Sequence, residues 1–403
     1  MRKFFTLALC LAAVCSVSAQ KQNVDKAQKL VGKDSQTART LIKQAMENPE
    51  TQKDARTYFV AGKIEFADVD DAFKRTMINP NDPSVDPVAT GKSLLDGYAY
   101  FLEALPLDSL PDAKGKIKPR FSKDILSEIA GHHNDFYSAG ANFFNKKKFY
   151  PEAYQAFLIY ADMPDMKLLG KMAPQSPDTI RATAYFNAGL AAYSGNSVEE
   201  SAKAFHRASQ LGYNAPEAYV YEIGCWQSIA QSDSTQTESA YQHIADIAKA
   251  GYEKFGLKNV FFINNLINTM VTKGDFAGAL GLVENEIAKN PDTAMLYGLE
   301  GFIYDRKGDN DKSEAAYRKA ISCSKPDAET LALASKKFYR AGNDKWNAIE
   351  GTGPEANAAR QNIKTNYWEK ALDLAKQAKS LNPKDHTLDR IIESLEYNLT
   401  TYF

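Results

Sequence analysis

Residues 90–93, Thr-Gly-Lys-Ser, match the end of a P-loop, in which a lysine and several backbone amides hold the phosphates of a nucleotide. A complete P-loop has a glycine five positions before Gly91, where this sequence has Asp86. Pro87, which follows, has no N–H to donate to a phosphate. We therefore interpret the segment as a loop that ends at the N-terminus of a helix.

Residues 351–356, Gly-Thr-Gly-Pro-Glu-Ala, match the dinucleotide-binding fingerprint in its Gly/Ala form. That fingerprint binds a pyrophosphate where it joins a strand to a helix, whereas the pattern that precedes it here is helical. Gly-Pro-Glu is also typical of a helix start, because proline is favoured at the first helical position. Neither glycine-containing segment predicts a cofactor.

His132 and His133, followed by Asp135, form the one histidine cluster of the sequence. Neighbouring residues of a helix point about 100° apart, so these two rings do not share a metal ion as an i, i+4 pair does. We expect them at a helix surface or interface and predict no metal site. No HExxH, CxxC or GxSxG motif occurs, so the sequence predicts no catalytic residues and no enzyme.

The composition describes an ordinary globular chain, with 44% hydrophobic and 25% charged residues. The 49 lysines and arginines are balanced by 50 aspartates and glutamates, which excludes the positive excess that nucleic-acid binding requires. A chain of 403 residues is longer than one compact core usually holds. No stretch alternates in the way a strand does, so the elements that position any site are expected to be helices.

Three glycines, Gly274, Gly308 and Gly342, follow one another at a spacing of 34 residues. Apolar, aromatic and small residues recur at matching distances before and after them. The matching positions are Ile263, Tyr297, Leu331, Met270, Tyr304, Phe338, Ala279, Ser313, Val283 and Tyr317. Apolar positions three and four residues apart make one face of a helix, and a glycine permits the left-handed backbone of a turn. The period therefore predicts repeated helix–turn–helix units.

This pattern resembles the tetratricopeptide repeat (TPR) family, in an exported bacterial type. The resemblance implies an all-α fold, a TPR-type right-handed solenoid of about seven helical hairpins with a C-terminal capping helix. We expect divergent TPR-like hairpins over 20–165 and the main solenoid over 166–403. Cys225 and Cys323 fall in repeats that another repeat separates, so we expect two buried thiols without a disulfide.

The last repeat is interrupted. Its first helix is expected to end near Gly342, but the alanine pattern of its second helix begins only at Ala371. This predicts an insertion over 343–366. Residues 385–402 then carry apolar residues on one side and are expected to form the helix that covers the end of the solenoid.

In TPR proteins the first helices of the repeats line a concave groove, and the resemblance assigns that role here. The assigned residues are Phe261, Asn264, Asn268, Phe302, Asp305, Arg306, Lys336, Tyr339 and Arg340. Arg306 and Arg340 hold equivalent positions and, with Lys336, make a cationic strip that favours a partner with acidic groups. The alternative is a solvated strip whose positive charges form surface ion pairs with Asp305 and Glu329.

Residues 1–19 have the charged start, apolar run and small C-terminal residues of a signal peptide, with cleavage expected after Ala19. Neither cysteine of this segment follows the residues of a lipobox, so a lipoprotein is not expected. No later stretch is apolar enough to span a membrane. We expect an exported protein of the periplasm or the outer membrane surface.

The predicted function is a non-catalytic scaffold of the bacterial cell envelope that binds a protein or peptide, with no cofactor, metal or nucleic acid. A second hypothesis is a soluble accessory component of an envelope nutrient-uptake or assembly system, which binds a glycan or an outer-membrane partner. A third is an all-α hydrolase, which requires two facing carboxylates in a pocket. The oligomeric state is not predicted.

Overall fold

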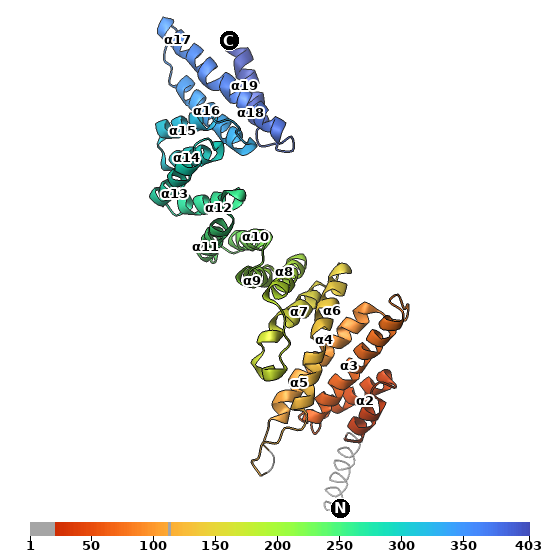
Figure 1. Cartoon of the computed structure of the whole chain (residues 1–403). Coiled ribbons are helices and arrows are strands. Elements are labelled where there is room, and N and C mark those ends of the chain that lie inside the picture. Colours follow the sequence, from red (N-terminus) through yellow and green to blue (C-terminus); the bar gives the residue numbers. More distant parts are fainter. Residues whose placement is uncertain (1–20, 112–113) are drawn as a thin grey trace, which may run out of the picture. The chain divides into compact units, whose positions relative to one another are not determined.

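The computed structural model describes residues 21–111 and 114–403, and the predicted signal peptide lies outside these residues. The described residues are helices joined by turns, apart from one isolated antiparallel bridge between Pro111 and Ile117 (Figure 1). The prediction of an all-α fold is therefore confirmed. The contacts divide the chain into two compact units between Ala240 and Tyr241, inside helix α11 (Thr237–Phe255). The division into 20–165 and 166–403 stays a prediction.

The described part of the first unit begins with a helix over 21–30 and continues through consecutive helices of ten or more residues with two short 3-10 turns. These elements are α2 (Ser35–Glu47), α3 (Ala55–Ile78), α4 (Pro87–Asp108), α5 (Ser122–Gly131), α6 (His133–Asn145), α7 (Tyr150–Asp162), η1 (Met163–Asp165), η2 (Lys167–Met172), α8 (Asp178–Ser194), α9 (Val198–Gln210) and α10 (Glu217–Ser232). Helices α3/α4, α6/α7 and α8/α9 pack as pairs, and each pair packs on the next.

The paired helices approach closely because a glycine on the first faces an aromatic ring on the second. A Cβ atom at Gly189 of α8 would lie 2.6 Å from the ring of Phe205 of α9. In the same way Gly62 of α3 faces Phe101 of α4, whose side chain is fully buried. These contacts fix which faces of the helices meet.

Asp108, the last residue of α4, holds the loop that follows it against the start of α5. Its carboxylate accepts hydrogen bonds from the backbone N–H groups of Arg120, Phe121 and Ser122 at 2.8–2.9 Å and from the Ser122 hydroxyl at 2.7 Å. One buried carboxylate thus pairs with three amides that the loop and the helix start would otherwise leave without a partner.

Replacing Asp108 with alanine is expected to lower the free energy of unfolding by about 1–3 kcal/mol, because these amides lose their acceptor. Urea unfolding measures the loss, and limited trypsin digestion between residues 109 and 121 should become faster. Asp108→Asn retains one acceptor oxygen and should lose less. An alanine variant with wild-type stability and wild-type digestion would contradict this role of Asp108.

The second unit comprises the remaining helices, including most of α11. These elements are η3 (Gly256–Lys258), α12 (Val260–Thr272), α13 (Phe276–Lys289), α14 (Ala294–Lys307), α15 (Asn310–Ala320), α16 (Ala328–Asn347), α17 (Pro354–Ile363), the π-helical turn η4 (Lys364–Trp368), α18 (Glu369–Leu381) and α19 (Asp389–Thr401). Helices α12/α13, α14/α15 and α16/α18 form successive pairs.

Two of the three repeat glycines form the turns that the sequence predicts. Gly274 and Gly308 have φ angles of 78° and 87°, in the left-handed region that glycine tolerates. The prediction for Gly342 is wrong. It lies inside α16, which continues to Asn347, and a Cβ atom there would lie 2.7 Å from the indole of Trp368. The π-helical turn η4 places this large ring against the glycine, so α16 packs against η4 there and does not turn.

Residues 343–366 lengthen α16, form α17 and enter the π-helical turn that leads into α18. The capping helix is present and begins at Asp389, four residues later than expected. Leu388 and Leu395 are fully buried, and Ile391, Ile392 and Leu399 pack against the same apolar cluster of α16 and α18. Helix α19 thereby covers an apolar face of the last pair.

Candidate binding surfaces

The residues assigned to the groove of the second unit lie on α12, α14 and α16, and they differ in exposure. Phe261, Asn264, Phe302, Asp305, Lys336 and Tyr339 are half-buried, whereas Asn268, Arg306 and Arg340 are exposed. Phe302 and Tyr339 pack against the apolar clusters of the unit, so each ring belongs partly to the core. The exposed polar residues are therefore the part of this surface that a partner can reach first.

The structure brings Asp305 and Arg340 together but leaves Arg306 outside that contact. Arg340 Nη2 lies 2.6 Å from Asp305 Oδ2. Asn264 Nδ2 of α12 lies 3.5 Å from Glu329 Oε2 of α16, and Asn264 Oδ1 is buried without a hydrogen-bond donor. Asp305 thus pairs with one cation of the strip, as the solvated alternative predicts, but Glu329 contacts the amide of Asn264 instead. Arg306 takes part in no ion pair among the described residues.

A buried lysine that the sequence reasoning missed completes this surface. Lys337 has a side chain 5% exposed, and its Nζ lies 2.9 Å from Asp305 and 2.8 Å from the amide oxygen of Asn310. Burial alone would raise the pKa of Asp305, but the hydrogen bonds from Lys337 and Arg340 outweigh it and lower that pKa. One carboxylate therefore faces two cations, and Arg306 and Lys336 leave the strip positive.

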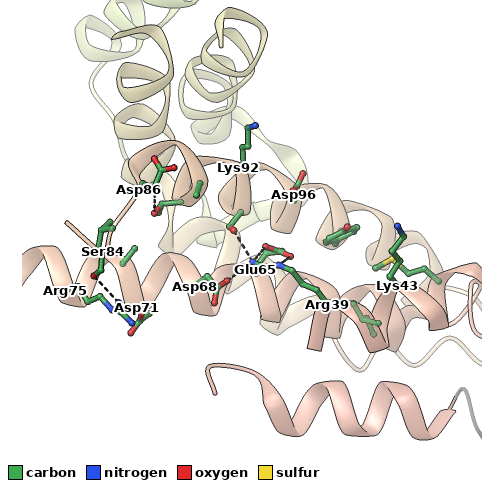
Figure 2. A pocket seen from close by; sticks show the side chains of 18 of the residues that line it. Arg39, Lys43, Glu65, Asp68, Asp71, Arg75, Ser84, Asp86, Lys92 and Asp96 are labelled. Atoms are coloured by element: carbon green, nitrogen blue, oxygen red, sulfur yellow. Dashed lines mark hydrogen bonds and ion pairs between the residues drawn. The ribbon is translucent and has the colours of Figure 1, made fainter. Parts of the chain in front are cut away.

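A second candidate surface lies elsewhere, in an open groove of about 890 Å³ between α2, α3 and α4 (Figure 2). Arg39 of α2 reaches across it. Its Nε lies 2.7 Å from Glu65 of α3, and its Nη2 lies 2.6 Å from Asp68 and 3.2 Å from the Ser93 hydroxyl of α4. The signal for this site is a stripe of charged residues at helical spacing on α3, namely Glu65, Asp68, Asp71 and Arg75.

The interpretation of residues 90–93 as a loop is wrong, whereas residues 351–353 precede a helix start as expected. Residues 90–93 lie inside α4, which begins at Pro87 and is capped by the Asp86 carboxylate. Gly91 packs against the ring of Phe143, so it forms no phosphate-binding loop. Pro354 is the first residue of α17, as expected for a helix start.

The two histidines lie at helix interfaces. His133 Nε2 lies 2.9 Å from the carbonyl oxygen of Tyr160, its ring stacks on that residue, and burial lowers its pKa. His132 Nδ1 lies 2.8 Å from the Asp135 carboxylate. Cys225 and Cys323 are buried and free, as predicted.

Over residues 21–111 and 114–403, no three histidine, cysteine or acidic side chains gather as metal ligands. No helix in these ranges has the length and apolar character needed to cross a bilayer.

No protein-family model and no curated protein matches the sequence. Solved structures that match the chain include a TPR repeats protein from Bacteroides fragilis NCTC 9343, at 16% identity over 66% of this chain and 98% of that chain, with a TM-score of 0.32. The P58(IPK) TPR domain matches at 10% identity over 95% and 99%, with a TM-score of 0.27. Yeast Tom70 matches at 13% identity over 94% and 96%, with a TM-score of 0.25. The helix pairs of the chain itself establish the all-α hairpin fold.

Proposed function

We propose that the protein is a non-catalytic scaffold that binds an extended protein or peptide segment with acidic groups. The proposed site is the strip on α12, α14 and α16. The observation that carries the proposal is the positive excess of this strip, where Arg306 is exposed and Asp305 already faces both Lys337 and Arg340. A guanidinium group without an ion-pair partner, on a protein of nearly zero net charge, can bind a carboxylate of a partner.

The repeat geometry supports an extended ligand rather than a compact one. Arg306 and Arg340 hold equivalent positions on successive first helices, and neighbouring packed helices lie about 8–10 Å apart. A segment that crosses α14 and α16 can therefore present acidic side chains to both guanidinium groups. The half-buried rings of Phe302 and Tyr339 add apolar area beside these cations.

Charge reversal at Arg306 and Arg340 tests the proposal. The probe is a set of labelled peptides that combine glutamates with one aromatic residue, and fluorescence anisotropy measures their affinity. Arg306→Glu with Arg340→Glu should weaken binding at least about tenfold, with the larger difference at low salt. Arg306→Glu alone retains the contacts of Asp305 and keeps the test valid if the double variant unfolds.

The matched control is Lys307→Glu with Lys325→Glu, which changes the net charge equally at exposed residues outside the strip. This control should bind almost as wild type does. An equal loss of affinity in both double variants would show that the change in net charge alone causes the effect. Wild-type affinity in a folded Arg306→Glu, Arg340→Glu protein would reject the strip as the site.

Export to the cell envelope is a further part of the proposal and rests on residues 1–19 alone. Production of the full chain in a Gram-negative host should yield a mature protein that begins at Gln20 and fractionates with the periplasm or outer membrane. N-terminal sequencing that finds an unprocessed Met1 in the cytoplasmic fraction would contradict export.

A further inference from the structure

The groove between α2, α3 and α4 has more negative than positive groups. Six carboxylates and four basic side chains line it. Arg75 pairs with Asp71 at 2.8 Å, and Asp86 caps α4, so these groups are already partnered. Lys92 places its ammonium over the ring of Phe149 at 4.8 Å. The negative excess therefore lies in the middle of the groove, around Arg39.

There the guanidinium of Arg39 forms ion pairs with two carboxylates, Glu65 and Asp68. A third carboxylate, that of Asp96, lines the groove beside them. Asp96, from the facing side of α4, has no hydrogen-bond or ion-pair partner in the described structure and lines the same space (Figure 2). Asp96 is exposed, but partial desolvation, and after it the charge of Glu65, raises its pKa, and the charges of Arg39 and Lys92 offset only part of this rise. Burial and the charges of Asp96 and Glu65 likewise raise the pKa of Tyr100. A cation placed at Asp96 would relieve this repulsion.

An apolar pocket of about 170 Å³ adjoins the groove and shares Ala72, Val85 and Thr90 with it. Its other walls include Val69, Phe73 and Leu94, and α6 closes it through Ala139. A cavity of about 150 Å³ holds benzene, so this pocket accommodates one aromatic or leucine-sized side chain.

The end of α3 beside this pocket is unusually apolar for a helix surface. Phe73, Met77 and Ile78 are 56%, 70% and 88% exposed. Large exposed apolar side chains gathered next to a pocket are typical of a protein-binding surface. An open charged groove beside an apolar pocket fits a peptide that carries both kinds of side chain better than a compact small molecule.

We infer that this groove is a second peptide-binding site, which takes a segment with a lysine or arginine next to an aromatic or leucine side chain. The basic group binds at the exposed carboxylate of Asp96, beside Tyr100, and the apolar side chain enters the pocket between α3, α4 and α6. This site lies in the first unit, prefers the opposite charge to the strip on α12, α14 and α16, and does not depend on that strip.

Fluorescence anisotropy with three short blocked peptides tests the inference on the intact protein. The first peptide places two lysines around one phenylalanine, the second has glutamates in place of the lysines, and the third has serine in place of the phenylalanine. The first should bind at least about tenfold tighter than either of the others, and high salt should weaken it. No binding of the first peptide, or equal binding of all three, would overturn the inference.

Variants then locate the bound peptide. Asp96→Asn removes the charge, and Ser138→Trp fills the apolar pocket from an exposed position of α6. Each variant should weaken binding of the first peptide at least about tenfold. Glu103→Gln removes the same charge from an exposed position of α4 outside the groove and should bind as wild type does. Circular dichroism establishes that each variant is folded.

Failure of this inference and failure of the proposed function are distinguishable. If Arg306→Glu with Arg340→Glu weakens binding of the lysine peptide while Asp96→Asn and Ser138→Trp do not, the groove is not the binding site of this peptide. If the groove variants alone weaken it, the second site stands whatever the acidic peptides do.

Discussion

Gly301→Leu is expected to lower the free energy of unfolding of the second unit by about 1–3 kcal/mol or more. A Cβ atom at this position of α14 would lie 2.9 Å from the ring of Tyr317 of α15, and that tyrosine is 3% exposed. The ring has no free space to move into, and the Ser313 hydroxyl also donates a hydrogen bond to the Gly301 carbonyl at 2.9 Å. Leucine therefore forces α14 and α15 apart.

Because each pair of a repeat protein is stabilised by its neighbours, the loss should extend to adjacent helices of the unit. Thermal unfolding followed by circular dichroism measures it, and hydrogen exchange locates it. Gly281→Leu is the matched control, since Gly281 lies in α13 with no heavy atom within 4 Å of its Cβ position. That variant should be unchanged or more stable, because leucine favours a helix over glycine. Equal melting curves for the two variants would contradict the packing role of Gly301.

Asp305→Leu is expected to be still more destabilising, by about 3–5 kcal/mol. The substitution leaves the buried ammonium of Lys337 with the neutral amide oxygen of Asn310 at 2.8 Å as its nearest partner. An unpaired charge in the interior costs far more than a lost surface contact. Urea unfolding of the variant measures the difference from wild type.

Lys337→Met tests the cause of this loss. It removes the buried charge and leaves Asp305 paired with the exposed Arg340, so its own cost should be smaller. The double variant Asp305→Leu with Lys337→Met should regain part of the stability lost in Asp305→Leu. If the double variant loses as much stability as the two single variants together, the unpaired charge of Lys337 is not the cause of the loss in Asp305→Leu.

The pH dependence of Asp305→Leu follows from the lowered pKa of Asp305. A carboxyl group whose pKa is lower in the folded state contributes stability above its unfolded pKa, about 3.9, and loses it as the pH falls through the folded value. The difference in stability between wild type and variant should therefore be constant near neutral pH and shrink below about pH 4.

The repeat period alone predicts the helix pairs around Gly274 and Gly308, because each pair repeats the same local packing. Gly342 shows the limit of that argument. The same period places a turn there, but the distant Trp368 packs against the glycine and α16 continues past it. Contacts between residues in different helices decide such positions, and a local pattern does not contain them.

For the candidate surfaces, too, one part of the arrangement follows from the sequence period and the other part only from the three-dimensional packing. The equivalent positions of Arg306 and Arg340 follow from the spacing, but only the three-dimensional packing places Lys337 and Arg340 on the same carboxylate. The groove in the first unit combines α2, α3 and α4, whose repeats are too divergent for the period to align Arg39 with Glu65 and Asp96. A charged stripe on α3 was the one available signal.

Photo-crosslinking from α12 tests most directly whether a ligand lies across the first helices of the second unit. Asn268 of α12 and Asn285 of α13 are both exposed, and they belong to the first and second helices of one pair. A benzoylphenylalanine placed at each position gives two otherwise matched proteins. With the tightest acidic peptide, we expect a crosslink from position 268 and none from position 285. A crosslink from position 285 alone would contradict the account and place the ligand on the second helices.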